Sequence, residues 1–434
     1  MKNMLLGTVA GLAMVGTAAA ADLPVKAKPA EYVKICSAYG AGFYYIPGTD
    51  TCLKVGGFVQ VDAYVQDFPD FAESSYADSY FKARGSIRLD ARTQTEYGLL
   101  RSFIDLRATY GDSGAGDGNY ASGTGINLDK GYIQFAGFTF GKVQSFFDFY
   151  ADNNIWGFDS PAITADSNSI AIAYTFDFGN GFSATVSIED DSNRTSGLYN
   201  TGPYFDPVSG APYFAQGTDI PALIANIAYE GEWGGFKLSA MVREIDTDTN
   251  LNDFDEVLPT GTSFNDDYGY AFLAGVVFNL PALGEGDTLY IEGTWANGAV
   301  QYTGASGGLI GQGADQYYDA STNEFNASQA WSIAAELTHY FTPSLFGVLY
   351  GGYANLDTQT PGYLDFDEEF DIFAGYDTWT VGGSLNWSPV KNLVFVAQYT
   401  YSQYDYDDVK YGGYTYSTDD TDAQQFILSV RRSF

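Results

Sequence analysis

Six of the twenty basic residues of this chain lie within 26 residues, and in each half of that stretch they share one parity: Lys82, Arg84, Arg88, Arg92, then Arg101 and Arg107. Apolar residues hold the other parity: Phe81, Ala83, Ile87, Leu89, Ala91, then Ile104, Leu106 and Ala108. Because successive side chains of a strand point to opposite faces, this spacing predicts two strands with one charged face. Asp90 and Asp105 share that face as ion-pair partners. Five arginines exceed two acids, so we expect excess positive charge.

Carboxylates gather in the segment 147–167, which contains no basic residue and is unusually apolar for a loop; its acids are Asp148, Asp152, Asp159 and Asp166. Covalent catalysis is not indicated by the sequence. A catalytic thiol needs a neighbouring base, and His339, the single histidine, is far in sequence from Cys36 and Cys52. The residues that could act are therefore fixed charges, and the predicted chemistry is electrostatic.

The composition excludes several classes of protein. The chain has 434 residues, 54 Asp+Glu against 20 Lys+Arg, and a formal net charge of −34, whereas a nucleic-acid binder needs a surplus of Lys and Arg. Aromatic residues make up 17%, which is too many for a disordered acidic chain. The mean hydropathy of −0.14 excludes a bundle of membrane helices, each of which needs about 20 consecutive apolar residues. A glycine- and aromatic-rich β protein with acidic surfaces remains.

Residues 1–21 have the pattern of a secretory signal peptide, with Lys2, an uncharged stretch and cleavage after Ala20 or Ala21. A membrane-anchoring helix is the alternative, but the segment is short, rich in Gly and Ala, and followed by no basic stop signal. We expect residues 22–434 to form the exported domain. In an oxidising compartment the only two cysteines, Cys36 and Cys52, are expected to form a disulfide rather than two free thiols.

Alternation of apolar and polar residues with a period of two recurs from residue 54 to the C-terminus and predicts strands. Short turns are predicted near 94–97, 136–138, 178–182, 231–235, 281–286, 341–343 and 389–392. Long polar stretches lie between these turns, at roughly 67–78, 111–128, 147–167, 191–221, 247–267, 297–328, 356–375 and 406–423.

Seven short turns and eight long loops separate sixteen strands. This asymmetry is typical of a transmembrane β-barrel, with short periplasmic turns and long outer loops. A soluble propeller or sandwich also alternates, but its loops tend to be comparable at both ends, and no repeat of blade length is visible. We therefore predict an all-β, transmembrane, antiparallel 16-stranded β-barrel. Its charged face lines the lumen, because Arg on the lipid face costs about 2–4 kcal/mol at mid-bilayer.

The segment from Glu31 to Gly57, EYVKICSAYGAGFYYIPGTDTCLKVGG, resembles the N-terminal region of the alphaproteobacterial porins, as found in rhizobia and brucellae. The signal peptide, the sixteen-strand rhythm and Phe434 extend the resemblance over the chain, although Arg432 departs from the usual terminal alternation. The resemblance implies a homotrimeric porin of the Gram-negative outer membrane, in contact with lipid and lipopolysaccharide, that passes small hydrophilic solutes and ions. It implies no cofactor.

In general porins the third loop folds into the barrel and constricts it, and the segment 147–167 occupies the corresponding place. We infer an eyelet with arginines on one wall and carboxylates on the other: Arg84, Arg88, Arg92, Arg101 and Arg107 against Asp148, Asp152, Asp159 and Asp166. A low-dielectric rim would make this transverse field strong, so that polar solutes align in it. The alternative is that the arginines are only ion pairs that fill the barrel interior.

Two further questions stay open in the sequence. An acidic group in a predicted outer loop could hold divalent cations that bridge to lipopolysaccharide, attract cations, or simply be solvated; it comprises Asp365, Asp367, Glu368, Glu369 and Asp371. The function itself has one main alternative, a substrate-specific outer-membrane channel for a particular solute class. An outer-membrane enzyme is disfavoured because the sequence offers no convincing nucleophile with a base.

Overall fold

The computed structural model describes most of the chain. The described residues are 34–67, 79–111, 124–149, 154–156, 166–195, 198–199, 220–245, 263–264, 268–305, 315–319, 324–366, 369–411, 414–416 and 420–434. The predicted signal peptide, residues 1–21, lies outside them.

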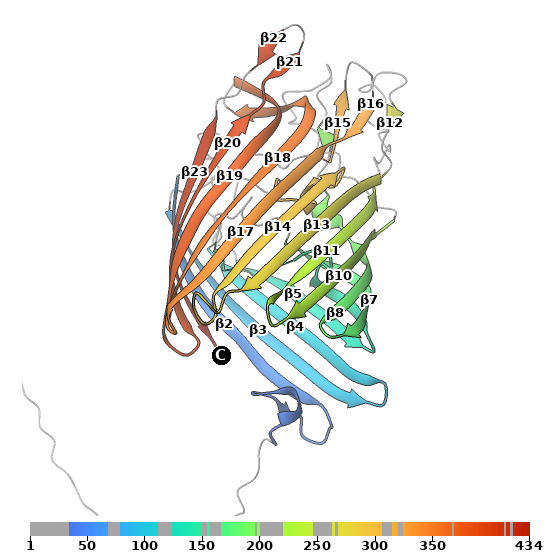
Figure 1. The fold of residues 1–434 in the computed structure, drawn as a ribbon, viewed down its shortest axis with the longest axis vertical. Helices are drawn as coiled ribbons and strands as arrows, with labels where there is room; N and C mark the ends of the chain where they lie inside the picture. The colour runs from blue at the N-terminus through green and yellow to red at the C-terminus, as the bar shows by residue number, and fades with distance from the viewer. Residues whose placement is uncertain are drawn as a thin grey trace, which may run out of the picture.

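Within the described residues, sixteen antiparallel strands close into one barrel (Figure 1). The ring closes where β2 pairs with β23, from Phe58 opposite Ser433 to Asp67 opposite Gln424. The predicted fold class is confirmed. The barrel strands are β2 (Cys52–Asp67), β3 (Ser79–Thr95), β4 (Gly98–Tyr110), β5 (Thr124–Phe135), β6 (Phe138–Gln144), β7 (Asn168–Gly179), β8 (Phe182–Asp190), β10 (Ala222–Gly231), β11 (Gly234–Glu244), β13 (Tyr268–Asn279), β14 (Thr288–Asn297), β17 (Gln329–Thr342), β18 (Leu345–Phe366), β19 (Glu369–Val390), β20 (Leu393–Tyr406) and β23 (Thr421–Ser433).

Shorter elements lie outside this ring. One joins β2, four form a small sheet and two form a hairpin: β1 (Tyr44–Tyr45); β9 (Leu198–Tyr199), β12 (Ser263–Phe264), β15 (Gln316–Asp319) and β16 (Glu324–Ala327); β21 (Val409–Tyr411) and β22 (Tyr414–Tyr416). The described 3-10 helices are η1 (Ser37–Tyr39), η2 (Ser192–Arg194) and η3 (Val300–Tyr302). None of the described helices is long and apolar enough to cross a membrane.

The two faces of each strand differ in the way that the alternation predicts. On β2, the side chains of Val59 and Val61 are 57% and 48% exposed on the outside of the ring, whereas Gln60 and Asp62 are buried inside it. A soluble protein buries its apolar face, so this inverted pattern fits a barrel with hydrocarbon outside and polar groups within.

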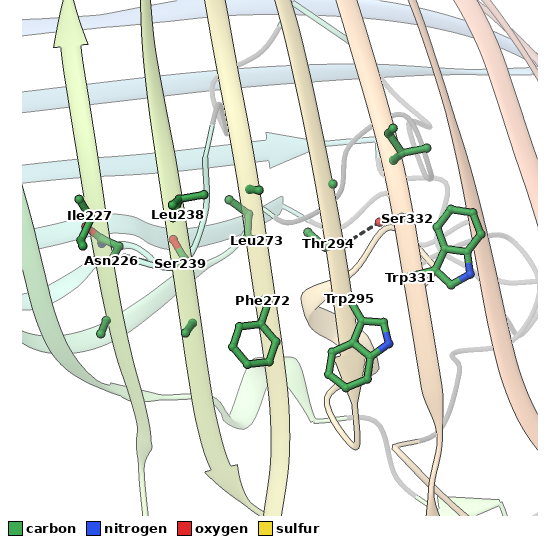
Figure 2. Close-up of a pocket in the computed structure, with 15 residues that line it drawn as sticks. Asn226, Ile227, Leu238, Ser239, Phe272, Leu273, Thr294, Trp295, Trp331 and Ser332 are labelled. Carbon is green, nitrogen blue, oxygen red and sulfur yellow. Dashed lines mark hydrogen bonds between the residues drawn. The ribbon is translucent and has the colours of Figure 1, made fainter.

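The outer face of β10 to β17 shows the same inversion over a wider area (Figure 2). Small residues such as Ala240 and Gly293 leave a shallow groove there, bordered by the rings of Phe272, Trp295 and Trp331. These three rings are 40–53% exposed on the outer face. Aromatic side chains in such a position are typical of the girdles of membrane barrels.

All seven predicted short turns are present, at 96–97, 136–137, 180–181, 232–233, 280–287, 343–344 and 391–392. Two of them pair a residue at positive φ with a glycine at positive φ: Ala136 (50°) with Gly137 (87°), and Asn180 (55°) with Gly181 (86°). Two consecutive positive φ angles define the tight type I′ hairpin turn, whose twist matches that of the flanking strands.

The predicted loop 356–375 is different in the structure. The stretch 356–375 is not a free polar loop, because β18 runs to Phe366 and β19 starts at Glu369, so that each strand has 22 residues. Their pairing is interrupted only by a register shift between Asp357 and Gly362. Aromatic and β-branched residues are frequent in this stretch, which favours continued strand pairing above the barrel rim. The acidic residues Asp367 and Glu368 lie outside the described residues.

The predicted disulfide between Cys36 and Cys52 is confirmed. It ties the segment before β2 to the start of that strand at the short-turn end, where Phe43 packs on both half-cystines. Both cysteines are 1% exposed and Phe43 is 4% exposed. The bridge therefore holds a small apolar cluster together beside the short pairing of β1 with β2.

Replacing both Cys36 and Cys52 with serine is expected to open this segment and to leave the barrel folded. Losing a loop closure of this size removes about 2–3 kcal/mol, which raises the open population at least about tenfold. Limited proteolysis read by mass spectrometry should show cleavage within residues 37–51 at least about tenfold faster, with the same barrel core. Equal cleavage rates in the native and serine proteins would contradict this role of the bridge.

Candidate constriction of the barrel lumen

The cationic face of β3 and β4 lies inside the barrel, and most of its arginines form ion pairs. Arg88 contacts Asp105 at 2.8 Å. Asp90 forms ion pairs with two arginines, Arg92 at 2.8 Å and Arg101 at 3.0 Å. The arginines therefore do form ion pairs inside the barrel. Whether this face keeps a net positive charge depends on how many carboxylates lie beside the arginines.

A third acid, not identified from the sequence, joins this face. Asp129 on β5 lies 2.7 Å from Arg107, which also contacts Asp105 at 3.3 Å. A register shift between Asp105 and Leu106 in the β4–β5 ladder adds one residue to β5 and turns Asp129 inward. Strict alternation could not show this, because a bulge changes the parity.

Positive charge still exceeds negative charge on this wall. Arg88, Arg92, Arg101 and Arg107 share three carboxylates. Arg84 donates to Thr109 at 3.3 Å and contacts no carboxylate among the described residues. The side chain of Arg88 is 38% exposed, against 23–24% for the other three paired arginines. Arg88 is therefore the paired arginine most available to a solute.

The arginines form a stripe rather than a ring. Arg84, Arg88 and Arg92 are four residues apart on one strand, so each step is about 13 Å along β3. At the short-turn end, the guanidinium of Arg92 lies 4.9 Å from the ring centre of Phe43, next to the disulfide. The stripe thus runs from the middle of the lumen to its short-turn mouth.

The described part of the segment between β6 and β7 lies within the barrel, against the wall opposite this stripe. Inward side chains of β10 and β11 hold its start, because Asn226 donates to the Phe146 carbonyl at 2.7 Å and Lys237 donates to the Asp148 carbonyl at 2.6 Å. Farther along, the amide side chain of Asn154 donates to Glu336 on β17 at 3.2 Å. The described residues of this segment therefore reach from one part of the inner wall to another, as expected for a constriction loop.

The middle of this segment, at Trp156, is held by one side chain of β20. The backbone N–H of Trp156 donates to Gln398 Oε1 at 2.9 Å, and Gln398 Nε2 donates back to the Trp156 carbonyl. A side-chain amide can satisfy both backbone groups of one residue in this way. Trp156 is thereby held at a fixed place in the lumen.

Arg431, a residue that the sequence reading overlooked, joins the two walls. Its guanidinium lies 3.9 Å from the ring centre of Phe58 and 5.8 Å from that of Trp156. Arg88 lies 5.5 Å from the same Phe58 ring. The inward parity of β23, with Ile427 and Ser429 buried, is the signal that could have identified it. Two arginines therefore meet at the Phe58 ring, and one of them reaches Trp156 in the middle of the inward segment.

The four predicted acids of the segment have different positions. Asp148 is buried and forms an ion pair of 2.5 Å with Arg194, which follows β8. Asp166 is exposed and accepts from Gln144 Nε2 at 2.9 Å. Asp152 and Asp159 lie outside the described residues. The carboxylate wall therefore stays a prediction for these positions.

Other carboxylates line the wall beneath the segment. Glu189, Glu292 and Glu336 are at most 2% exposed and come from β8, β14 and β17. Glu189 accepts the backbone N–H of Phe146 at 2.9 Å. Each is a single acid among small and polar residues of inward parity, so the sequence gives only a weak signal for it. They place buried carboxyl groups on the wall opposite the arginine stripe.

The comparison with protein families gives one match over nearly the whole chain. The family model described as "Porin subfamily" matches residues 22–428. Among curated proteins, Porin Omp2b of Brucella canis is 35% identical over 242 residues, which cover 54% of this chain and 63% of that protein. The alignment thus spans less than two thirds of the relative's length.

Solved structures of similar shape come from outer-membrane proteins. The outer membrane channel DcaP of Acinetobacter baumannii superimposes with a TM-score of 0.63 and 16% identity, covering 90% of this chain and 99% of that one. OmpT of Vibrio cholerae gives a TM-score of 0.50 and 10% identity over 90% and 99% of the two chains. At these identities the similarity concerns the fold alone.

Proposed function

Because the chain belongs to the porin subfamily, we propose that it forms a water-filled channel through which small hydrophilic solutes and ions diffuse passively. Its place is the outer membrane of Gram-negative bacteria. The observation that carries the proposal is the inverted barrel with charged side chains inside and a segment folded across its lumen.

The narrowest level of this channel is proposed to lie where Arg88 and Arg431 both approach Phe58 and Arg431 also approaches Trp156. A solute there passes between the arginines of β3 and β23 on one side and, on the other, the wall that carries the buried carboxyl groups. The field across such a gap is strong because the surrounding protein screens charge less than water does. A dipolar solute can align in this field, whereas an apolar solute must displace oriented water.

The purified full chain, reconstituted in planar lipid bilayers, is expected to give stepwise conductance increments that grow with salt concentration in several different salts. The reversal potential in a salt gradient gives the ion preference. Saturable block by one solute class would identify a substrate-specific channel instead. A folded protein that inserts without conductance would overturn the channel proposal.

The assembly is also a proposal. The family resemblance favours a homotrimer, and the exposed apolar outer face supports a protein that contacts lipid or other copies of itself. Lipopolysaccharide would contact the outer rim. Analytical ultracentrifugation in detergent gives the number of chains directly, and a monomer at all protein concentrations would contradict the trimer.

A further inference from the structure

A second segment, between β14 and the start of β15, also folds into the barrel. It runs from Gly298 to Ala305 and contains the helix η3. Ala299, Val300, Tyr302 and Ala305 are at most 1% exposed. The polar stretch 297–328 predicts an outer loop here, and the burial of these residues differs from that prediction.

The segment rests on the inner wall of β17 to β20. Its Gly304 N–H donates to Ser332 Oγ at 2.8 Å, and Ser332 points inward, because its neighbours Trp331 and Ile333 are exposed on the outer face. The hydroxyl of Tyr376 on β19 donates to the Ala305 carbonyl. Val300 packs in an apolar cluster inside the barrel, with Ala330, Ala354, Leu356, Tyr376 and Tyr404.

The same segment contacts the segment between β6 and β7, residues 145–167, which is called the constriction loop below. The ring of Tyr302 meets that of Phe147 edge-on at 5.0 Å between ring centres. The guanidinium of Arg194, which pairs with Asp148, lies 4.5 Å from the Tyr302 ring on another side. Tyr302 therefore lies between an aromatic ring of the constriction loop and the cation that holds this loop's carboxylate.

A buried cation anchors the start of the segment. Arg243 donates to the Gly298 carbonyl at 3.0 Å and contacts Asp315 and Asp191. Asp315 in turn accepts the Val300 N–H at 2.8 Å. All three charged side chains are 0% exposed. A dry, hydrogen-bonded network of this kind fixes one conformation rather than a mobile loop.

We propose that the segment Gly298–Ala305 is a second constricting element, which fills the side of the lumen next to β14 to β20 and confines solutes to the arginine side. Tyr302 is then a residue that determines the size of solute admitted. The inference rests on the proposed channel function and adds a size determinant distinct from the constriction loop. The solutes concerned are hydrophilic molecules near the upper size limit of the pore.

Replacing Tyr302 with alanine is expected to raise single-channel conductance about twofold, because losing its contacts with Phe147 and Arg194 lets the two inward segments move apart and widens the pore. Polyethylene glycols of graded size, added to both sides of the bilayer, should enter the variant at a larger size than in the unchanged protein. Tyr270→Ala is the matched control, since Tyr270 is opposite Asn297 next to the segment but is 43% exposed on the outer face. It should change neither quantity. Unchanged conductance and size limit in a folded Tyr302→Ala protein would overturn the proposal.

A cross-link tests the inward position without weakening the fold. The double variant Gly304→Cys and Ser332→Cys places two thiols at positions that are in hydrogen-bond contact in the native protein. The native cysteines do not interfere, because they are bonded to each other. The pair is expected to oxidise readily and to leave conductance unchanged. Failure to cross-link, or a cross-linked channel with lower conductance than its reduced form, would mean that the segment normally lies elsewhere. A native protein without any conductance would instead refute the channel function.

Discussion

Replacing Arg88 and Arg431 together with alanine is expected to shift the ion preference of the channel towards cations. Each guanidinium contributes about 1–2 kcal/mol to the potential felt by an ion some 8 Å away at an effective dielectric constant of about 20, after partial screening by salt. Two such charges change the ratio of cation to anion permeability about tenfold or more. The measurement is the reversal potential in a tenfold salt gradient, with single-channel conductance alongside.

The pair is chosen on contacts rather than on sequence spacing. Arg88 is the most exposed paired arginine, and Arg431 is the cation next to Trp156. Arg92, by contrast, lies under Phe43 and makes two hydrogen bonds with Asp90, so its removal should change the reversal potential less. Removing both arginines also vacates side-chain volume beside Phe58, so conductance should increase.

Arg432→Ala provides the control for charge alone. Arg432 is adjacent to Arg431 but donates to the Lys391 carbonyl on the exposed side of the strand. Like Arg431→Ala, the Arg432→Ala substitution removes one positive charge from β23, but this charge lies outside the lumen. The control should therefore leave the reversal potential unchanged. A double variant with native selectivity, or a control variant with an equal shift, would show that Arg88 and Arg431 do not form the constriction.

The barrel could be predicted from the sequence because the facing of its strands and the position of its tight turns depend on residues that are neighbours in the chain. The alternation of Val59 and Val61 with Gln60 and Asp62 predicts which face meets lipid, and pairs such as Asn180-Gly181 predict where a hairpin closes. Neither requires knowledge of a distant residue. Strand lengths were less predictable, since the extension of β18 to Phe366 depends on pairing with β19 rather than on a boundary signal.

The interior was only partly predictable because its contacts are not local. Asp148 was identified as a constriction acid, but its partner Arg194 is 46 residues away. The Phe147–Tyr302 contact and the link from Trp156 to Gln398 join still more distant positions. For Arg431, the parity of β23 indicates an inward side chain, but the sequence does not show that this arginine meets Phe58 and Trp156. Charge and parity thus indicate which residues enter the lumen, and three-dimensional contacts decide which of them meet.

Replacing Arg243 with methionine is expected to cause the largest loss of stability. The substitution leaves Asp191 and Asp315, both 0% exposed, without their cation. Breaking a buried pair by removing one partner costs about 3–5 kcal/mol, because the remaining charge stays buried. Urea unfolding of the protein in detergent micelles, followed by tryptophan fluorescence, measures the change in the free energy of unfolding.

The loss should depend on pH in a defined direction. Burial already raises the pKa of the Asp191 carboxyl, and the charge of Arg243 opposes this shift. Without Arg243 the native state holds a proton on Asp191 more tightly than the unfolded state does. The stability of the variant should therefore be highest below the unfolded-state pKa of Asp191 and should be lost as pH rises through the raised folded-state pKa. If the free energy of unfolding of the variant is lower than that of the native protein by the same amount at every pH, the cause is lost packing rather than uncompensated charge.

A triple variant separates the charge from the shape of the site. Arg243→Met combined with Asp191→Asn and Asp315→Asn removes all three charges and keeps an amide oxygen that can accept the Val300 N–H. Replacing a complete buried ionic network with neutral groups is often neutral or stabilising, so most of the lost free energy should return. If the triple variant is as unstable as Arg243→Met alone, the network acts through hydrogen bonds from the guanidinium to Gly298 and Arg194 carbonyls rather than through charge balance. Recovery of stability would show that Arg243 is required chiefly because two acids are buried beside it.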